Sequence, residues 1–232
     1  MSSVLAGRAA DIRERIRAAS LRAGRNPSDV RLMAVTKTHP RETVLEAYKA
    51  GIRVFGENRV SEAAEKYADF APEAELHLIG HLQTNKAKAA AALFPWVDSV
   101  DSLHTAQALA RRLEALGKTA NILLELNTSG EASKSGYGSF EDLERDLDGI
   151  LLLAPLRLRG LMTVGPLTQD EGEIRRAFRN LNACMDRLLR LVPASCRPDT
   201  LSMGMSSDFE IAIEEGATLV RLGTVLFGRR DA

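Results

Sequence analysis

Lys37 is the residue whose type and position most favour chemistry. It follows an apolar run, Leu32 to Val35, that is typical of a buried parallel strand, and Pro40 begins a helical pattern just after it. A lysine at the end of a buried strand is expected to have little access to water, and a desolvated amine loses its proton more readily. A neutral amine can attack a carbonyl. The competing interpretation is a lysine whose charged end reaches solvent at the rim of the core.

Two later segments carry hydroxyls and glycines suited to binding an anion. Ser206 and Ser207 precede a predicted short helix, and Ser207 with Glu210 has the spacing of a capping box. Gly223 and Thr224 follow another apolar run, where a glycine lets the backbone approach a ligand closely. We expect these segments to bind a phosphate, although the same hydroxyls would also serve simply to cap their own helices.

Strands and helices alternate along the rest of the chain. A helix within residues 1–26 comes first, and each later strand is followed by a helical pattern or a final helical turn. The strands are expected at residues 32–35, 52–55, 76–79, 96–100, 121–126, 156–164, 200–203 and 218–222. Eight such units predict an α/β fold, a closed (β/α)8 TIM barrel with an extra N-terminal helix, forming a single domain over residues 1–232. The alternative is an open doubly wound sheet, but the glycine fingerprint for dinucleotides is absent after the first strand.

In such a barrel the reactive residues lie after the strands, and the eighth strand pairs with the first. Lys37 would therefore adjoin the predicted phosphate site. A ligand with both a carbonyl and a phosphate fits this pair, and pyridoxal 5′-phosphate (PLP) and a phosphorylated sugar are both such ligands. Arg221, near the end of the last strand, favours PLP, because a guanidinium only donates hydrogen bonds and would face a neutral ring nitrogen. The alternative for Arg221 is an ion pair inside the barrel.

Composition excludes several classes of function. The 31 basic and 31 acidic residues cancel and are dispersed, so neither nucleic acid nor an anionic membrane is an expected partner. Cys184 and Cys196 have no metal-binding or redox spacing, which indicates a reducing, cytoplasmic setting and no metal site. Charges interrupt the N-terminus too often for a signal peptide, and no apolar run approaches the length of a membrane span.

Six motifs in the chain carry a resemblance to a known family. They are Ala34-Val-Thr-Lys37, Phe55-Gly-Glu-Asn58, His77-Leu-Ile-Gly-His-Leu-Gln-Thr-Asn-Lys86, Gly160-Leu-Met162, Leu201-Ser-Met-Gly-Met-Ser206 and Val220-Arg-Leu-Gly-Thr-Val-Leu-Phe-Gly228. Together, over nearly the whole chain, they resemble the pyridoxal phosphate homeostasis protein family, single-barrel relatives of the alanine racemase N-terminal domain.

The resemblance implies a role for each matched residue. Lys37 would hold PLP as a Schiff base, and Arg221 would face the ring nitrogen. The remaining cofactor contacts would be made by residues that hold the phosphate or line the ring. These are Ser206, Gly223 and Thr224 for the phosphate, and Asn58 and Met203 for the ring. Lys134 resembles a position linked to a second, weaker cofactor contact, and Arg59 stands where family members often carry Tyr or an apolar residue.

The resemblance also implies a carrier or regulator of vitamin B6 rather than an enzyme. We expect a monomer whose partners include PLP-dependent apo-enzymes. A two-base racemase needs an acid or base on each face of its substrate. Related racemases take the second, a tyrosine, from an added C-terminal domain of a partner chain, and this chain ends at Ala232. Of Tyr48, Tyr67 and Tyr137, only Tyr137 is expected to reach the open face.

Two alternative functions stay open at this point. One is a PLP-dependent amino-acid racemase of low activity. The other is a Schiff-base aldolase or sugar-phosphate isomerase on the same barrel.

Overall fold

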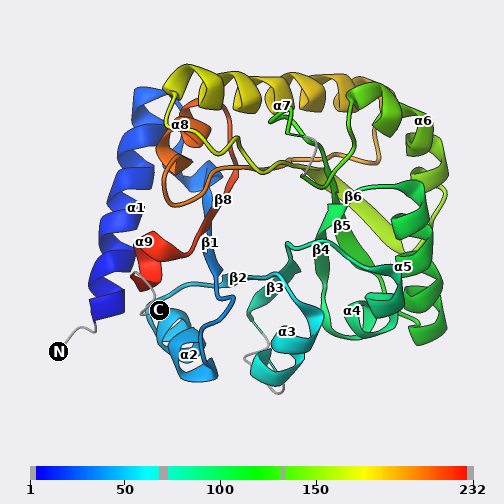
Figure 1. The fold of residues 1–232 in the computed structure, drawn as a ribbon, viewed down its shortest axis with the longest axis horizontal. Coiled ribbons are helices and arrows are strands. Elements are labelled where there is room, and N and C mark those ends of the chain that lie inside the picture. Colours follow the sequence, from blue (N-terminus) through cyan, green and yellow to red (C-terminus); the bar gives the residue numbers. More distant parts are fainter. Residues whose placement is uncertain (1–3, 68–72, 132–133, 229–232) are drawn as a thin grey trace.

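Eight parallel strands form a closed barrel in the order β1 to β8, with β8 hydrogen-bonded to β1 (Figure 1). The computed structural model describes residues 4–67, 73–131 and 134–228. The strands are β1 (Arg31–Val35), β2 (Val54–Glu57), β3 (Glu75–Leu78), β4 (Trp96–Val100), β5 (Ala120–Glu125), β6 (Leu156–Met162), β7 (Thr200–Ser202) and β8 (Leu219–Leu222). The predicted TIM barrel is confirmed.

The helices surround this barrel (Figure 1). They are α1 (Val4–Arg22), α2 (Arg41–Lys49), α3 (Val60–Tyr67), α4 (Ala87–Leu93), α5 (Leu103–Leu116), α6 (Phe140–Leu151), α7 (Glu171–Leu191), α8 (Phe209–Glu214) and α9 (Thr224–Phe227). Local signals in the sequence fix several ends. Ser102 and Ser139 accept backbone N–H groups at the starts of α5 and α6, and Gly117 ends α5 in the left-handed conformation.

The second strand begins two residues later than predicted. Ile52 was expected to start it, but the Ile52 N–H donates to the Ala47 carbonyl, which closes the end of α2. The Ile52 side chain is buried in the core, so its hydrophobicity serves helix packing rather than the sheet. Met33 of β1 consequently pairs with Val54. This register moves Gly56 and Glu57 into the strand and places Asn58 directly after it.

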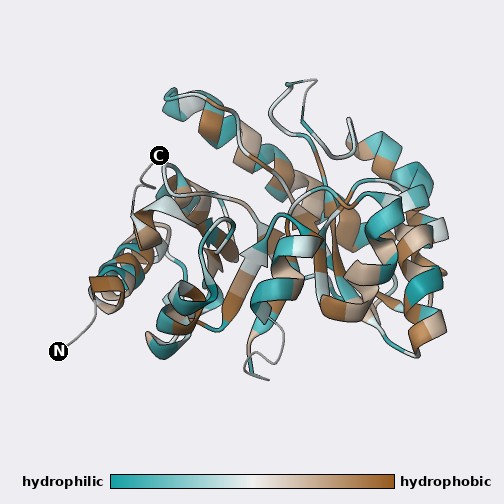
Figure 2. Cartoon of the chain, turned by 60° about the horizontal axis from the view of Figure 1, so that its bottom comes forward, coloured by the Kyte–Doolittle hydropathy of each residue, from teal (hydrophilic) through white to brown (hydrophobic). Residues whose placement is uncertain are grey.

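Hydrophobic residues fill two regions of the molecule. Most lie between the barrel and its helices, and Figure 2 shows the strands largely hydrophobic and the helices hydrophilic on their outer sides. Smaller apolar groups, Met33 with Val54 and Leu219, and Trp96 with Leu123 and Met162, form separate buried clusters that alternate with the outward-facing set. Buried charged groups on the same strands share this inner layer. They are His77, Asp98, Glu125 and Arg221.

The N-terminal helix α1 packs against α8 and α9, beside the last strand of the barrel (Figure 1). Its apolar side, which includes Ile12 and Ile16, is buried. Arg15 pairs with Glu210 of α8 at 3.1 Å, and Arg22 pairs with Glu214 at 2.8 Å. The extra helix therefore supports the segment between β7 and β8 from outside. Within the described ranges, no helix is long and apolar enough to cross a membrane.

Candidate functional site

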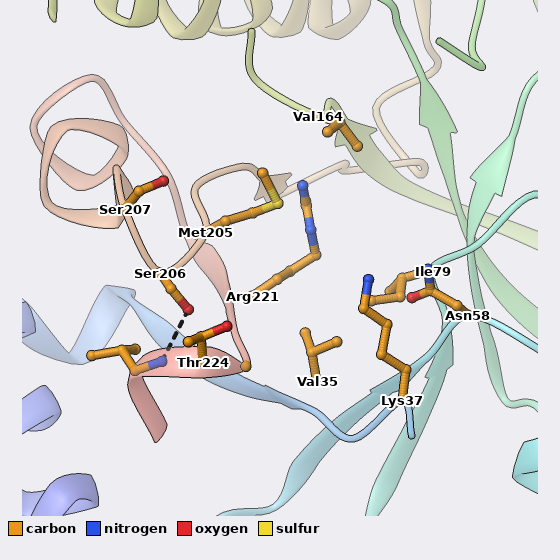
Figure 3. Close-up of a pocket in the computed structure, with 12 residues that line it drawn as sticks. Val35, Lys37, Asn58, Ile79, Val164, Met205, Ser206, Ser207, Arg221 and Thr224 are labelled. Atoms are coloured by element: carbon orange, nitrogen blue, oxygen red, sulfur yellow. Dashed lines mark hydrogen bonds between the residues drawn. The ribbon is translucent and has the colours of Figure 1, made fainter. Parts of the chain in front are cut away.

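A cavity of about 670 Å³ opens where β1, β2, β3, β6, β7 and β8 end (Figure 3). It is lined by Val35, Lys37, Asn58, Ile79, Val164, Met205, Ser206, Ser207, Arg221, Gly223, Thr224 and Val225. Six of the seven residues predicted to contact a cofactor are in this set, and Met203 is not. Sequence reasoning missed the apolar walls formed by Ile79 and Val164. Their positions, one residue after β3 and two residues after β6, were the available signal.

The Lys37 side chain rises from the end of β1 beside Asn58 and Ile79 (Figure 3). Its amine forms no hydrogen bond or ion pair with any of the residues described. Lys37 is half-buried, so its side chain has more access to water than a lysine inside packed core would have. The reason is that the strand ends at an open cavity rather than inside packed core. The lysine is therefore accessible both to a ligand in the cavity and to solvent.

Ser206 and Thr224 bring two hydroxyls to one side of the cavity. Ser206 Oγ accepts the backbone N–H of Val225 at 3.2 Å, which joins the loop after β7 to the start of α9. Thr224 is the first residue of α9, so its own N–H has no partner within the helix. A Cβ on Gly223 would meet nothing closer than the Val35 carbonyl oxygen, at 3.6 Å. The packing of the chain itself therefore leaves open space beside the Gly223 backbone, where an anion can approach.

The predicted capping box of Ser207 and Glu210 is not formed. Asp208 precedes α8, and its Oδ1 accepts the Met205 N–H at 2.6 Å, so the aspartate organises this turn. Ser207 is exposed, and Figure 3 shows its hydroxyl turned away from Thr224. Glu210 points to the other side of its helix, where it pairs with Arg15. The Asp208 side chain therefore holds Met205 in the loop and caps no N–H of α8, while Ser206 lines the cavity.

Met203 is fully buried in the hydrophobic core, which corrects its predicted place beside a ligand ring. Its N–H donates to the Leu219 carbonyl, so it still continues β7. Gly204 then adopts φ +93°, and the chain reverses direction there. Met205 follows this turn and lines the cavity instead. Two methionines separated by one glycine cannot be distinguished by residue type.

Arg221 is buried and fixed by three hydrogen bonds. Nη1 donates to the Ser202 carbonyl at 2.7 Å and to Ser202 Oγ at 2.8 Å, and Nη2 donates to the Thr163 carbonyl at 2.6 Å. Burial lowers the pKa of Arg221, while the charges of Asp98 and Glu125 oppose that shift. Nε forms no hydrogen bond to a residue within the described ranges. The three bonds use three of the five guanidinium N–H groups, so Nε and one N–H of Nη2 are left for a ligand.

Asn58 lies beside Lys37 in the cavity (Figure 3). The loop after β3 passes so close to it that a Cβ on Gly80 would lie 2.3 Å from the Asn58 carbonyl oxygen. Only glycine fits at that position without moving the Asn58 backbone. The Gly80 in the long His77–Lys86 motif is therefore part of what places Asn58.

Tyr137 and Lys134, which were considered as further residues of the site, do not line the cavity. Tyr137 was expected to reach the open face of the barrel. It is instead buried, its hydroxyl donates to Asp146 Oδ2 at 3.0 Å, and it does not line the cavity. Lys134 donates to Glu131 at 2.6 Å and to the Gly165 carbonyl at 2.7 Å. Its amine is engaged by the loop, and Lys134 does not line the cavity. Within the described residues, no cluster of three or more His, Cys, Asp or Glu is arranged to hold a metal ion.

The arrangement fits a ligand of defined chemistry. The Lys37 amine has no partner among the described residues, and an amine that is not engaged can attack an aldehyde or ketone. Two hydroxyls, open backbone and an unpaired helix N–H suit a phosphate. A buried guanidinium suits a neutral acceptor atom. The cavity thus accommodates a phosphorylated carbonyl compound that also carries a ring acceptor.

Comparison with known proteins agrees with this chemistry. Residues 8–231 match the family described as "Alanine racemase, N-terminal domain". A protein of Pseudomonas aeruginosa named "Pyridoxal phosphate homeostasis protein" is 45% identical over 230 residues, which covers 99% of this chain and 97% of that protein.

Solved structures of a PLP-binding relative and of an alanine racemase are also similar to this chain. PipY of Synechococcus elongatus PCC7942, in a structure with PLP bound, is 40% identical with a TM-score of 0.80, covering 94% of this chain and 100% of that one. Alanine racemase of Clostridium difficile 630 is only 14% identical with a TM-score of 0.73, covering 94% of this chain and 56% of that one, and shares the fold.

Proposed function

The chain belongs to the pyridoxal phosphate homeostasis protein family, and from this membership and the cavity we propose that it binds PLP as a Schiff base on Lys37. The observation that carries the proposal is the convergence of the unpartnered Lys37 amine, the Ser206 and Thr224 hydroxyls and the buried Arg221 in one cavity. PLP supplies an aldehyde that condenses with amines and a ring that withdraws electrons. The binding of PLP to a 40% identical relative supports the assignment.

Each residue has a distinct task in this proposal. Lys37 supplies the amine, and Asn58 lies beside the ring. Ser206, Thr224 and the open backbone of Gly223 hold the phosphate. Arg221 would donate one of its two remaining N–H groups to the ring nitrogen and leave that nitrogen unprotonated, because a guanidinium has no proton to give up at ordinary pH. A neutral ring nitrogen makes PLP a weaker electron sink, which favours storage over turnover.

We further propose that the protein carries or regulates PLP rather than catalysing a reaction. Racemisation needs an acid or base on each face of the substrate. Among the described residues that line the cavity, only Lys37 and Arg221 carry titratable side chains. Tyr137, the one tyrosine expected to reach the open face, is hydrogen-bonded to Asp146 instead. The names of the relatives, which denote homeostasis, support the same conclusion.

A carrier must pass PLP on to the enzymes that use it. We propose a monomeric, cytoplasmic protein of one barrel domain that passes PLP to PLP-dependent apo-enzymes. Pull-down of a panel of apo-enzymes with the PLP-loaded protein, against the same protein without PLP, measures this. Equal recovery by the two forms would contradict a delivery role.

Absorbance after incubation with PLP tests the binding proposal. The wild type is expected to gain a visible band, and borohydride reduction followed by peptide mapping should place the cofactor on Lys37. Lys37→Ala should lose both signals. Lys134→Ala is the matched control, since its amine is engaged by Glu131 and Gly165 outside the cavity. A colourless wild type would contradict the proposal.

Two further measurements separate the alternatives. Trapping of a sugar phosphate in place of PLP would favour an aldolase or isomerase. Solvent deuterium incorporation at the α-carbon of alanine, above that caused by free PLP, would indicate a racemase.

A further inference from the structure

Helix α3 contacts the backbone on both sides of Lys37. Lys66 Nζ donates to the Thr36 carbonyl at 2.6 Å, on the N-terminal side of the lysine. The Glu62 carboxylate accepts the N–H of Thr38, on the C-terminal side. Glu62 and Lys66 are one helical turn apart and pair with each other at 2.5 Å. Two residues of one helix thus bracket the Lys37 backbone as a single unit.

The conformation held by this unit is strained. Thr38 has φ +65° and is the sole non-glycine residue with positive φ in the described ranges. A β-branched residue is disfavoured there, because its side chain crowds the backbone, and such residues persist only where their surroundings hold them. The Thr38 N–H bond to Glu62 supplies that restraint. The direction in which Lys37 leaves β1 depends on this turn.

Further hydrogen bonds, made by Glu57 and Tyr67, hold Lys66 and Thr36 in place. Glu57 is fully buried in β2, and its Oε1 accepts from Lys66 Nζ at 3.0 Å and from Thr36 Oγ1 at 2.6 Å. Tyr67 of α3 shares a hydrogen bond with Thr36 Oγ1 at 2.7 Å. The residue after Glu57 is Asn58, which lines the cavity. The same network therefore fixes the strand ends that carry Lys37 and Asn58.

We propose that Glu62 and Lys66 are positioning residues that hold the Lys37 amine at the cofactor, in a role that rests on the proposed binding of PLP. Neither residue lines the cavity, so both act through the backbone of Thr36 and Thr38. The Glu62–Lys66 pair is partly buried, with 21% and 9% of the two side chains exposed, so the cost of desolvation offsets part of its attraction. Its placement on the two peptide groups that flank the reactive lysine accounts for its presence here.

The test measures how fast the visible band forms when PLP is mixed with each variant. Glu62→Ala and Lys66→Met each remove one arm of the unit, and misplacement of the amine should slow band formation by about 10-fold to 100-fold. Glu65→Ala is the matched control on the same helix, because Glu65 is exposed and forms no hydrogen bond to Thr36 or Thr38. Its band should form at the wild-type rate.

Thermal unfolding and a rescue variant separate positioning from stability. Leu147→Ala, in the core far from the cavity, lowers the melting temperature without touching α3. It should leave the rate unchanged. In the Glu62→Ala background, Thr38→Gly should restore much of the rate, since glycine adopts φ +65° without strain.

Each outcome decides the matter. Wild-type rates in both α3 variants would overturn the positioning role while leaving PLP binding intact. Equal slowing in Leu147→Ala would overturn it in favour of general destabilisation. A wild type without a visible band would remove the proposed function and, with it, this inference.

Discussion

Ser206 Oγ accepts the backbone N–H of Val225 at 3.2 Å, across the gap between the loop after β7 and helix α9. The bond joins two segments that are separated by all of α8 and β8. It uses one lone pair of the hydroxyl, whose proton is left for a ligand. The side chain that aligns the two segments is therefore also a donor to any phosphate between them.

Removing either cavity hydroxyl should weaken retention of PLP. Ser206→Ala and Thr224→Ala each delete one hydrogen bond to a charged phosphate, worth about 1.5 kcal/mol, so Kd should rise roughly tenfold for each. The visible band at saturating PLP should stay, because phosphate contact and imine formation are separate interactions. Fluorescence titration with PLP gives the Kd.

Ser207→Ala provides the comparison, since its hydroxyl lies on the same loop but turns away from Thr224 (Figure 3). Its Kd should match that of the wild type. Unchanged affinity in the Ser206→Ala/Thr224→Ala double variant would assign both hydroxyls to structure alone.

Arg221 should prove essential to stability as well as to the site. Arg221→Met leaves the carbonyls of Ser202 and Thr163 without their donor and leaves Asp98 and Glu125 without a nearby buried cation. Each buried acceptor left without its donor costs about 1 to 3 kcal/mol, so the total loss should be about 3 kcal/mol or more. Urea unfolding of the PLP-free protein measures the loss.

An exposed arginine gives the control for this change. Arg15→Met breaks a pair with Glu210 in which both side chains are more than a third exposed, and its cost should stay below about 1 kcal/mol. Similar losses in the two variants would show that Arg221 is not held by buried charges.

Much of this architecture is predictable because it depends on local signals. Apolar runs, helix stops and their alternation fix eight strand–helix units, and closure then places the ends of β8 and β1 together. Lys37, Arg221 and Thr224 therefore meet as expected around one cavity. The place of Asn58 in the cavity is predictable in the same way, because it comes directly after β2.

The errors arise where long-range geometry decides between similar residues. Met203 and Met205 have the same side chain, and only the reversal at Gly204 determines which enters the cavity. Ser207 and Asp208 both suit the start of a helix, but the Asp208 side chain accepts the Met205 N–H and caps no N–H of α8. The contacts of Lys66 with Thr36 cross 30 residues, and no local pattern indicates them.

Gly160 should tolerate no side chain. It has φ +152°, and a Cβ there would lie 1.8 Å from the Thr200 carbonyl oxygen of the neighbouring strand. Gly160→Ala must push β6 and β7 apart and should lower the free energy of unfolding by about 3 kcal/mol or more. Gly7→Ala in α1 meets no atom within 4 Å and should raise stability by about 0.5 to 1 kcal/mol. Urea unfolding of both variants checks the contrast, and equal effects would contradict it.

Glu125 should make the stability of the PLP-free protein fall as pH rises. Burial raises its pKa to about 7 in the folded protein, against the opposing charge of Arg221, from 4.5 when unfolded. The folded state thus binds more protons between these two values. The stabilisation is complete below pH 4.5 and is lost as pH rises through 7, amounting to about 3 kcal/mol.

Glu125→Gln stays neutral throughout, so it should match the wild type near pH 5 and be the more stable protein at pH 8. Other groups titrate in both proteins, so the difference between their urea-unfolding curves isolates Glu125. The exposed Glu65→Gln should follow the wild type at every pH. A constant difference between Glu125→Gln and the wild type from pH 5 to pH 8 would mean that Glu125 is already ionised at pH 5, and that the inner layer of the barrel holds its charge without cost.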